Sequence, residues 1–258
     1  MNFKERISIQ FTNLTKTDKK ITNYLLDNPA FLSDQSVQEA AKVIETSPAA
    51  LVRFSKKIGY KGLAELKIDL DRYAEEKPSL DDNNDETPKT AVLNHYRRNL
   101  NLIEEQLDEK QLQRIATTML EAKDLKILGI GSSGLNAEQM VYNLLYQDCY
   151  TESVTSKTKM YYLSRSLKKE TALLFYTVSG NTDFKAIFKA AKEAGSKTII
   201  VTMVDNAYVR KYADELVILP SNAMQVDQKE GSLYLLDNRS IFSIFSEILS
   251  SYIALELK

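Results

Sequence analysis

The feature that most constrains the fold of this 258-residue chain is an alternation of short apolar runs with helical patterns in its second half. Short apolar strands separated by helices are typical of a parallel sheet that is covered on both faces. The sequence therefore predicts an α/β domain, a five-stranded parallel sheet in an αβα sandwich. The predicted strands are Leu125–Ile130, Cys149–Val154, Ala172–Val178, Thr198–Met203 and Glu215–Leu219.

A polar segment divides the chain. "EEKPSLDDNNDETPKT" has two prolines, several acidic residues and almost nothing apolar, as a solvated linker does. Before this segment the sequence shows helix signals and no strand pattern. We therefore expect an all-α domain at residues 1–77, an acidic linker at 78–90 and the α/β domain at 91–258.

Composition excludes several classes of protein. The net charge of −1 gives no global attraction to nucleic acid or membranes. One cysteine, Cys149, cannot form an intramolecular disulfide, and one histidine, His95, limits metal and acid–base chemistry. The N-terminus has no apolar core of a signal peptide, and no apolar run reaches the length of a membrane span. We expect a cytoplasmic protein with no metal, no cofactor and no membrane contact.

Two of the predicted strands end in loops of small polar residues, "GIGSSG" and "VSGNT". Ligands of parallel sheets bind beyond the carboxyl ends of the strands. Both loops open helices, whose free N–H groups and positive dipole ends favour an anion. The sequence therefore predicts a site for a phosphate monoester. The loop side chains that would bind it are Ser132, Ser133, Ser179, Asn181 and Thr182.

Two other ligands and one purely structural role compete with binding of a phosphate monoester. Neither loop contains lysine or arginine, and the absence of a GxxxxGK[ST] sequence disfavours a nucleoside triphosphate with magnesium. The glycines of "GIGSSG" have the spacing of a dinucleotide fingerprint, but no acidic residue ends the second strand to bind a ribose. Alternatively, Ser179 and Thr182 only cap a helix.

"ILGIGSSG", "VSGNT" and "GSKTIIVT" resemble the sugar isomerase (SIS) domain, which binds phosphosugars. The resemblance covers roughly residues 110–225. It implies that Ser133, Thr177, Ser179 and Thr182 hold the phosphate.

"SVQEAAKVIETSPAALVRFSKKIGYKGLAELK" has the layout of a helix-turn-helix motif. Ser36 and Ser47 predict helix N-caps, as Thr17 does for an earlier helix, and Gly59 predicts a stop. Small residues at the start of the second helix would let it enter the major groove, and the following cations would meet phosphates. Alternatively, these charged residues are only the solvent-exposed face of a helix and bind no DNA. The candidate DNA-binding residues are Ser47, Ala49, Ala50, Arg53, Lys56, Lys57 and Lys61.

The N-terminal region is similar to that of RpiR-type transcriptional regulators, which join it to an SIS domain in the same order. This resemblance implies a DNA-binding regulator of carbohydrate metabolism, with operator DNA and a sugar phosphate effector as partners. Glu45 stands where that family often has glycine, so it must accept an uncomfortable backbone conformation unless the turn differs. A broad apolar face on the last predicted helix, about Arg239–Leu257, favours a homo-oligomer, a dimer or tetramer.

The main alternative is an SIS-type aldose–ketose isomerase. Such an enzyme needs a base to move a proton between adjacent carbons. His95 lies beyond the linker among polar residues, and Glu230 follows the last predicted strand. We expect no catalytic residue and therefore no enzyme.

Overall fold

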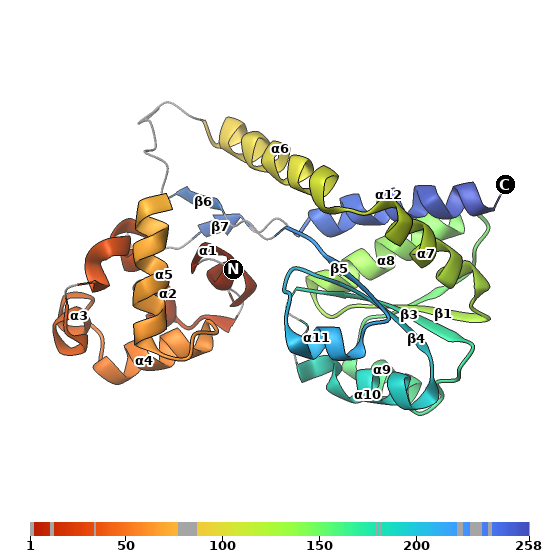
Figure 1. Cartoon of the computed structure of the whole chain (residues 1–258), viewed down its shortest axis with the longest axis horizontal. Coiled ribbons are helices and arrows are strands. Elements are labelled where there is room, and N and C mark those ends of the chain that lie inside the picture. The colour runs from red at the N-terminus through yellow and green to blue at the C-terminus, as the bar shows by residue number, and fades with distance from the viewer. Residues whose placement is uncertain are drawn as a thin grey trace. The chain divides into compact units, whose positions relative to one another are not determined.

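The computed structural model describes residues 3–10, 13–33, 35–76, 87–178, 180, 182–220, 224–227, 234–236 and 239–257. The chain divides into two compact units (Figure 1). The helical unit comprises Met1–Arg98 with Ser221–Asn238, and the α/β unit comprises Asn99–Pro220 with Arg239–Lys258. The division runs through α6 (Pro88–Gln106). Most of the predicted linker lies outside the described residues, and its boundaries stay a prediction.

The helical unit is built from short helices around one apolar core. Its helices are α1 (Phe3–Gln10), α2 (Lys16–Asp27), the 3-10 helix η2 (Pro29–Leu32), α3 (Val37–Val43), α4 (Pro48–Lys57) and α5 (Leu63–Glu76). Phe3 and Ile7 bring α1 into this core, although the sequence did not predict that helix. Their spacing of four residues places both on one helical face.

Capping residues set where these helices begin. A capping box at Ser36 and Glu39 opens α3, as predicted. The prediction for α2 was wrong, because Thr15 and not Thr17 caps it. Thr15 and Asp18 form a reciprocal capping box, which satisfies two backbone N–H groups and fixes the helix start two residues earlier.

The α/β unit contains the predicted parallel sheet, with strand order β2-β1-β3-β4-β5. All seven residues of β3 are buried because this strand lies at the centre with helices on both faces. The strands are β1 (Asp124–Leu128), β2 (Glu152–Val154), β3 (Thr171–Thr177), β4 (Lys197–Thr202) and β5 (Glu215–Ile218).

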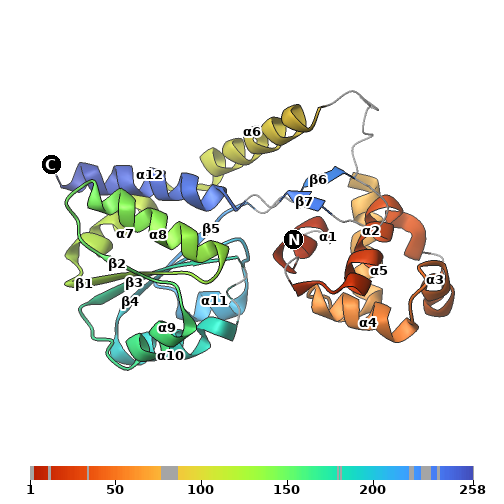
Figure 2. The same ribbon diagram turned by 180° about the vertical axis from the view of Figure 1, so that it is seen from behind.

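Alternate residues of the central strands face two separate cores. Leu174 and Tyr176 pack with α7 (Glu109–Glu121), α8 (Ser132–Leu145) and α12 (Ile241–Glu256). Leu173 and Phe175 pack with the opposite layer, as the alternation of side chains along a strand requires. Figures 1 and 2 show the two layers from both sides. The opposite layer consists of α9 (Lys157–Ser164), α10 (Lys185–Ala194) and α11 (Ala207–Tyr212).

The broad apolar face of α12 is largely used within its own unit. Phe242, Phe245 and Leu249 are fully buried, and α12 packs on both α7 and α8. Ile244 and Ile248 are half-buried against the same core. The width of this face is therefore explained without a partner chain.

A short antiparallel hairpin, β6 (Met224–Asp227) with β7 (Tyr234–Leu236), was not predicted. It belongs to the segment that groups with the helical unit. Glu230 falls between the two strands, outside the described residues. None of the helices in the described ranges combines the length and apolar character that a membrane span requires.

Candidate functional site

The two polar loops leave adjacent strands of the α/β sheet. β1 and β3 are hydrogen-bonded neighbours, with Leu128 opposite Phe175, so both strands run to the same edge. From β1 the chain runs outward to β2 and then returns past β1 to β3. That reversal is a topological switch point, where sheets of this kind bind ligands. We call this edge the strand-end crevice.

The first loop brings the start of α8 against the end of β1. A Cβ atom built on Gly129 would overlap the carbonyl oxygen of Ser133, so only glycine allows this close approach. Gly131 is the N-cap of α8, and no side chain of the described residues caps it. Ser133 is buried in the first turn of the helix. The first turn of α8 thus presents its N–H groups at the crevice.

The second loop is fixed by its own side chains and by β4. The Thr177 hydroxyl accepts a hydrogen bond from the Gly180 N–H at 3.0 Å. Gly180 has φ 57°, and a Cβ there would overlap the Val209 side chain. The Val178 carbonyl accepts bonds from the Met203 N–H and the Thr202 hydroxyl, both at 3.2 Å. Two strands therefore determine the path of this loop.

Of the predicted phosphate ligands, the structure brings Ser132, Ser133 and Thr177 to this edge. Ser179 and Asn181 lie outside the described residues. Thr182 begins the 3-10 helix η3 (Thr182–Phe184) ahead of α10, and its side chain is not among those described. The role of these six residues in phosphate binding stays a prediction.

The sequence did not indicate that Arg239 reaches the crevice. Arg239 Nη1 donates a hydrogen bond to Ser132 Oγ at 2.7 Å, across 107 residues of sequence. A second hydrogen bond joins α12 to α8, because Ser243 Oγ donates to Asn136 Oδ1 at 2.8 Å. Asn136 Nδ2 in turn donates to the Ser132 carbonyl at 3.0 Å. No local pattern connects such distant residues, so only the fold reveals the contact.

The helix-turn-helix motif of the helical unit consists of α3, the turn after it and α4. Ile44, Leu51 and Phe54 are buried between the helices. Ser47 is the N-cap of α4 and accepts a hydrogen bond from the Ala50 N–H at 3.1 Å. Pro48 follows at the first helical position, which favours proline.

Five predicted DNA-binding residues of this motif are exposed around α4, namely Ser47, Ala49, Arg53, Lys56 and Lys61. The prediction that Ala50 is exposed was wrong, since its relative exposure is only 9%. Ala50 shares a helical face with Leu51 and Phe54 and packs inward.

Lys57 makes an intramolecular contact. Its Nζ lies 2.6 Å from Asp18 Oδ2, and the Asp18 side chain is only 11% exposed. That carboxylate also accepts bonds from the Thr15 N–H and hydroxyl, both at 2.8 Å. Burial raises the pKa of Asp18, but these bonds from Lys57 and Thr15 outweigh burial and leave the pKa below its usual value. The Lys57 ammonium therefore ties α4 to α2.

The turn between α3 and α4 contains a left-handed residue. Glu45 has φ 51°, a conformation that suits glycine better than residues with a Cβ atom. Its carboxylate forms an ion pair with Lys20 of α2. Glu45 therefore has the strained left-handed conformation that its position in the turn predicted.

His95 lies on α6 and is buried, with its ring edge-on to Tyr96. Burial lowers the pKa of His95, and the charge of Arg98 lowers it further, so the ring is neutral near pH 7. These contacts support a packing role. Across the described ranges, His, Cys, Asp and Glu side chains do not gather in threes as metal ligands would.

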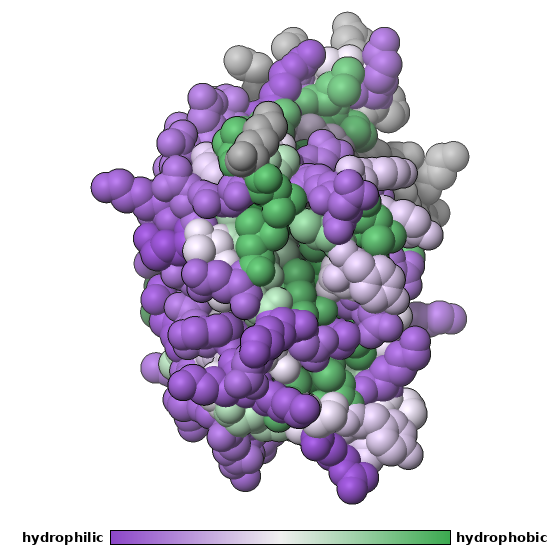
Figure 3. All heavy atoms as spheres, turned by 90° about the vertical axis from the view of Figure 1, so that its right-hand side faces the viewer, coloured by the Kyte–Doolittle hydropathy of each residue, from purple (hydrophilic) through white to green (hydrophobic). Residues whose placement is uncertain are grey.

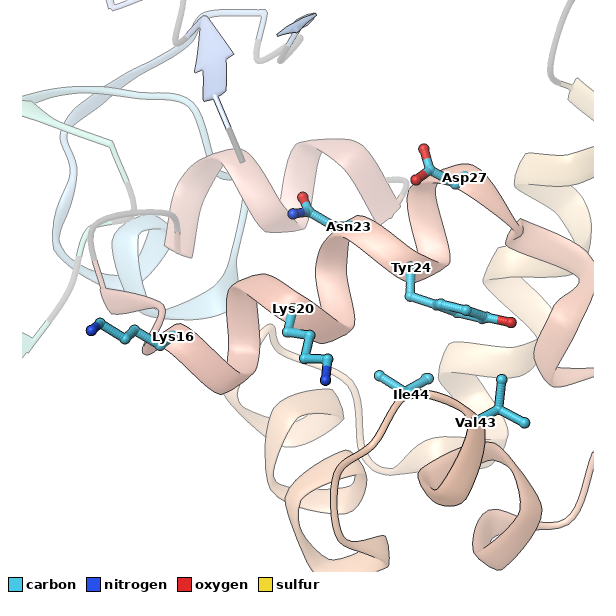
Figure 4. Close-up of a pocket in the computed structure, with 7 residues that line it drawn as sticks. All are labelled: Lys16, Lys20, Asn23, Tyr24, Asp27, Val43 and Ile44. Atoms are coloured by element: carbon cyan, nitrogen blue, oxygen red, sulfur yellow. The ribbon is translucent and has the colours of Figure 1, made fainter. Parts of the chain in front are cut away.

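A hollow of about 480 Å³ lies beside the helix-turn-helix motif, between α2 and the end of α3 (Figure 4). None of the predicted DNA-binding residues lines it. Its lining residues are Lys16, Lys20, Asn23, Tyr24, Asp27, Val43 and Ile44.

Comparisons with known proteins agree with this architecture. Residues 1–77 match the helix-turn-helix domain of the rpiR family. An HTH-type transcriptional regulator of Haemophilus influenzae is 28% identical over 84% of this chain and 79% of its own length. The HTH-type transcriptional regulator RpiR of Escherichia coli is 23% identical over 81% of this chain and 73% of its own.

Two solved structures share the fold. The NanR protein of Vibrio vulnificus, complexed with ManNAc-6P, has a TM-score of 0.53 at 15% identity and covers 98% of this chain and 89% of its own. The sugar isomerase domain of an RpiR transcription factor from Sphaerobacter thermophilus has a TM-score of 0.54 at 17% identity, over 64% of this chain and 88% of its own. Residues 1–77 are thus similar to the helix-turn-helix domain of the rpiR family, and the α/β unit shares the fold of a sugar isomerase domain.

Proposed function

We propose that this regulator binds operator DNA through α4 and that a sugar phosphate in the strand-end crevice controls that binding. The observation that carries the proposal is the pairing of β1 with β3, because it brings both polar loops to the switch point of the sheet. The NanR structure supports it as well, since that protein was solved with a sugar phosphate. The phosphate would be held by Ser132, Ser133, Thr177, Ser179, Asn181 and Thr182.

The exposed residues of α4 support the DNA-binding half of the proposal. Ala49 lies in the first turn, where small side chains allow close approach to base edges. Arg53 and Lys56 follow on the exposed surface, and Lys61 lies just beyond the helix. Lys57 is already paired with Asp18, so we assign it a structural role in place of the predicted phosphate contact.

We also propose that the protein has no isomerase activity. The sequence has one histidine, and His95 is buried on α6 with a lowered pKa. The curated relatives are named as transcriptional regulators. An isomerase would interconvert an aldose phosphate and a ketose phosphate, so turnover by the purified protein would favour that alternative.

The direct test combines a ligand screen with operator binding. Thermal-shift measurements against a panel of sugar phosphates should identify one that raises the midpoint of unfolding, as mass action requires. That compound should change the affinity of the protein for operator DNA in a gel-shift titration. The double variant Ser179→Ala/Thr182→Ala should still bind operator but stop responding to the compound. If the double variant kept wild-type ligand affinity, Ser179 and Thr182 would not bind the ligand and would only cap a helix.

A homo-oligomer is part of the proposal, because a dimer of helix-turn-helix motifs reads two half-sites. About half of the exposed large apolar residues of the α/β unit lie on α8 and just beyond it, and include Leu135, Tyr142, Tyr146 and Tyr150. Figure 3 faces the end at which the strands begin and shows hydrophobic side chains in a band between polar ones. A hollow of about 200 Å³ there is lined partly by Leu144 and Tyr150. Light scattering at micromolar concentration should give a mass above that of one chain.

A further inference from the structure

The positive charge of the α/β unit is concentrated in one stretch of its sequence. Residues 155–200 contain nine lysines and arginines against three acidic residues, a net charge of +6 in a chain whose net charge is −1. This stretch includes α9 and α10, which pack on each other in the layer drawn below the sheet in Figure 1. A local field of this sign attracts anions although the whole chain has almost no net charge.

Three lysines of this stretch lie where two neighbouring strands begin. Lys168 and Lys169 come just before β3, and Lys197 is the first residue of β4. The two strands pair in parallel, with Ala172 opposite Lys197, so the three lysines share the amino end of the sheet. Adjacent strands are about 4.8 Å apart, well within the Debye length of about 10 Å at 0.1 M salt, so the fields of these cations reinforce one another. We call these three residues the amino-end lysines.

Buried hydroxyl groups hold the backbone that presents these lysines. Ser196 Oγ donates a hydrogen bond to the Lys168 carbonyl at 2.7 Å, and Thr171 Oγ1 accepts one from the Lys168 N–H at 3.4 Å. Ser196 and Thr171 are buried, whereas the side chains of the amino-end lysines are exposed. The loops are therefore fixed before a partner binds, which lowers the entropic cost of a contact.

The two usual roles of surface cations do not account for the amino-end lysines. Cations at the end of a helix compensate its negative dipole end, a role that suits Arg165 at the C-cap of α9 and Lys192 in the last turn of α10. The amino-end lysines lie in no helix. Unlike Lys189, which pairs with Glu193 at 3.5 Å, none of them forms an ion pair within the described ranges, and neither does the neighbouring Glu170.

We propose that the amino-end lysines contact the phosphate backbone of duplex DNA that flanks the operator. This inference rests on the proposed function, which places operator DNA on α4. Lysine ammonium groups neutralise phosphates and release counterions without reading the bases. Because both units belong to one chain, operator binding raises the effective concentration of DNA around the α/β unit, so a few weak contacts suffice. The amino-end lysines add affinity and no sequence preference.

An anionic membrane is the competing partner for a basic surface. Binding to a membrane surface requires apolar side chains beside the cations, because these enter the bilayer. In the described part of residues 155–200, the exposed large apolar residues are Tyr161 and Tyr162, and Arg165 lies over the Tyr161 ring. Leu163 and Leu167 pack against the core. A surface with cations but without exposed aliphatic side chains favours DNA.

The experiment is a gel-shift titration of the full-length protein with two operator fragments, one ending at the half-sites and one extending beyond them on both sides. Lys168→Gln/Lys169→Gln should bind the long fragment about tenfold more weakly than the wild type, with a salt slope reduced by about 2, since two phosphate contacts are lost. Its affinity for the short fragment should be unchanged. Lys168→Arg/Lys169→Arg keeps both charges and should keep wild-type affinity for both fragments.

Lys185→Gln/Lys189→Gln is the matched control. It removes the same charge from the beginning of α10, at the other end of that helix from the amino-end lysines, and should bind both fragments like the wild type. A loss equal to that of Lys168→Gln/Lys169→Gln would overturn the inference, because only net charge would then matter.

The remaining outcomes separate this inference from the function on which it rests. If Lys168→Gln/Lys169→Gln binds the long fragment as tightly as the wild type, the inference is wrong and the proposed function stands. If the wild type binds neither fragment, the proposed function fails and the inference fails with it. Vesicles containing phosphatidylserine test the competing partner. Capture of the wild type but not of Lys168→Gln/Lys169→Gln, with equal DNA affinities, would assign the surface to a membrane and overturn the inference.

Discussion

The two candidate sites are built in opposite ways. In the helical unit, the predicted DNA contacts come from one continuous stretch, from Ser47 to Lys61, on the outside of a single helix and its flanks. In the α/β unit, the crevice draws on residues of α8 and β3 and on Arg239 just before α12, and Arg239 meets Ser132 across 107 residues. The residues of a continuous site can be identified from the sequence, whereas the residues of an assembled site are brought together only by the order of the strands. The two sites should consequently respond differently to substitution.

The largest effect is expected at the surface of α4. The double variant Arg53→Ala/Lys56→Ala should weaken operator binding more than a hundredfold, because each cation contributes about 1.5–3 kcal/mol through a charged contact. Its melting temperature should stay near the wild-type value, since both side chains are exposed. Gel-shift titration at several salt concentrations measures the affinity and the reduced salt slope.

Lys185→Ala/Lys189→Ala is the matched control for that double variant. It removes two exposed lysines from α10 of the other unit and should leave operator binding nearly unchanged. Equal losses in both double variants would mean that only net charge matters and that α4 is not the reading surface.

The next effect concerns the assembled site. Gly129→Ala places a methyl group against the Ser133 carbonyl, so the first turn of α8 must move away from β1. Such overpacking should destabilise the α/β unit by about 1–3 kcal/mol and abolish binding of the sugar phosphate. Chemical denaturation and calorimetry measure the two effects.

Gly62→Ala is its control, because an added Cβ there meets no atom within 4 Å. This variant should keep wild-type ligand affinity. Undiminished ligand binding in Gly129→Ala would show that the crevice does not depend on the contact between β1 and α8.

A third prediction separates two neighbouring lysines. Lys57→Ala removes the partner of a largely buried carboxylate and should destabilise the helical unit by about 1–2 kcal/mol. Lys56→Ala should weaken DNA binding and leave stability unchanged. Denaturant unfolding and gel shift on both variants test this assignment, and equal stabilities would contradict it.

The same ion pair predicts a dependence on pH. The folded-state pKa of Asp18 lies below its usual value, so its carboxylate contributes stability that is present above about pH 4. That contribution is lost as pH falls through the lowered pKa. In Lys57→Ala the pKa of Asp18 should rise towards its unfolded-state value, so less stability should be lost on acidification than in the wild type, as unfolding curves across the acidic range would show.

The smallest effect is expected at the turn before α4. Glu45→Gly relieves a left-handed residue with φ 51° but removes an exposed ion pair with Lys20. Relief of about 1 kcal/mol outweighs a surface pair of a few tenths, so stability should rise by about 0.5 kcal/mol. Lys20→Ala measures the ion pair alone, and a lower melting temperature in Glu45→Gly would mean that the pair outweighs the strain.

Much of the fold follows from local patterns. Apolar runs predicted all five strands of the parallel sheet within a few residues, and the capping box at Ser36 predicted the start of α3. The hairpin of β6 and β7 was missed because strands of four and three residues carry too little periodicity. The error at Ala50 has a similar cause, since an alanine gives no hydrophobic signal strong enough to show which way it faces.

The candidate sites were predictable only in part. The two loops were expected to form one site beyond the carboxyl ends of the strands, and the pairing of β1 with β3 brings both loops to the same edge. The contacts of Lys57 with Asp18 and of Arg239 with Ser132 were not predictable. Each joins elements whose relative position is set by the packing of the whole core.

The division of the chain also bears on how regulators of this kind can exchange modules. Ser221–Asn238 groups with the helical unit, so the α/β unit consists of two separate stretches of sequence. The chain passes from one unit to the other after Arg98, Pro220 and Asn238. A recombination event in the acidic linker would transfer α1 to α5 but leave behind the start of α6 and the hairpin of β6 and β7. Exchange of the complete helical unit should therefore require three junctions in the coding sequence, one near Arg98 and one on each side of the hairpin.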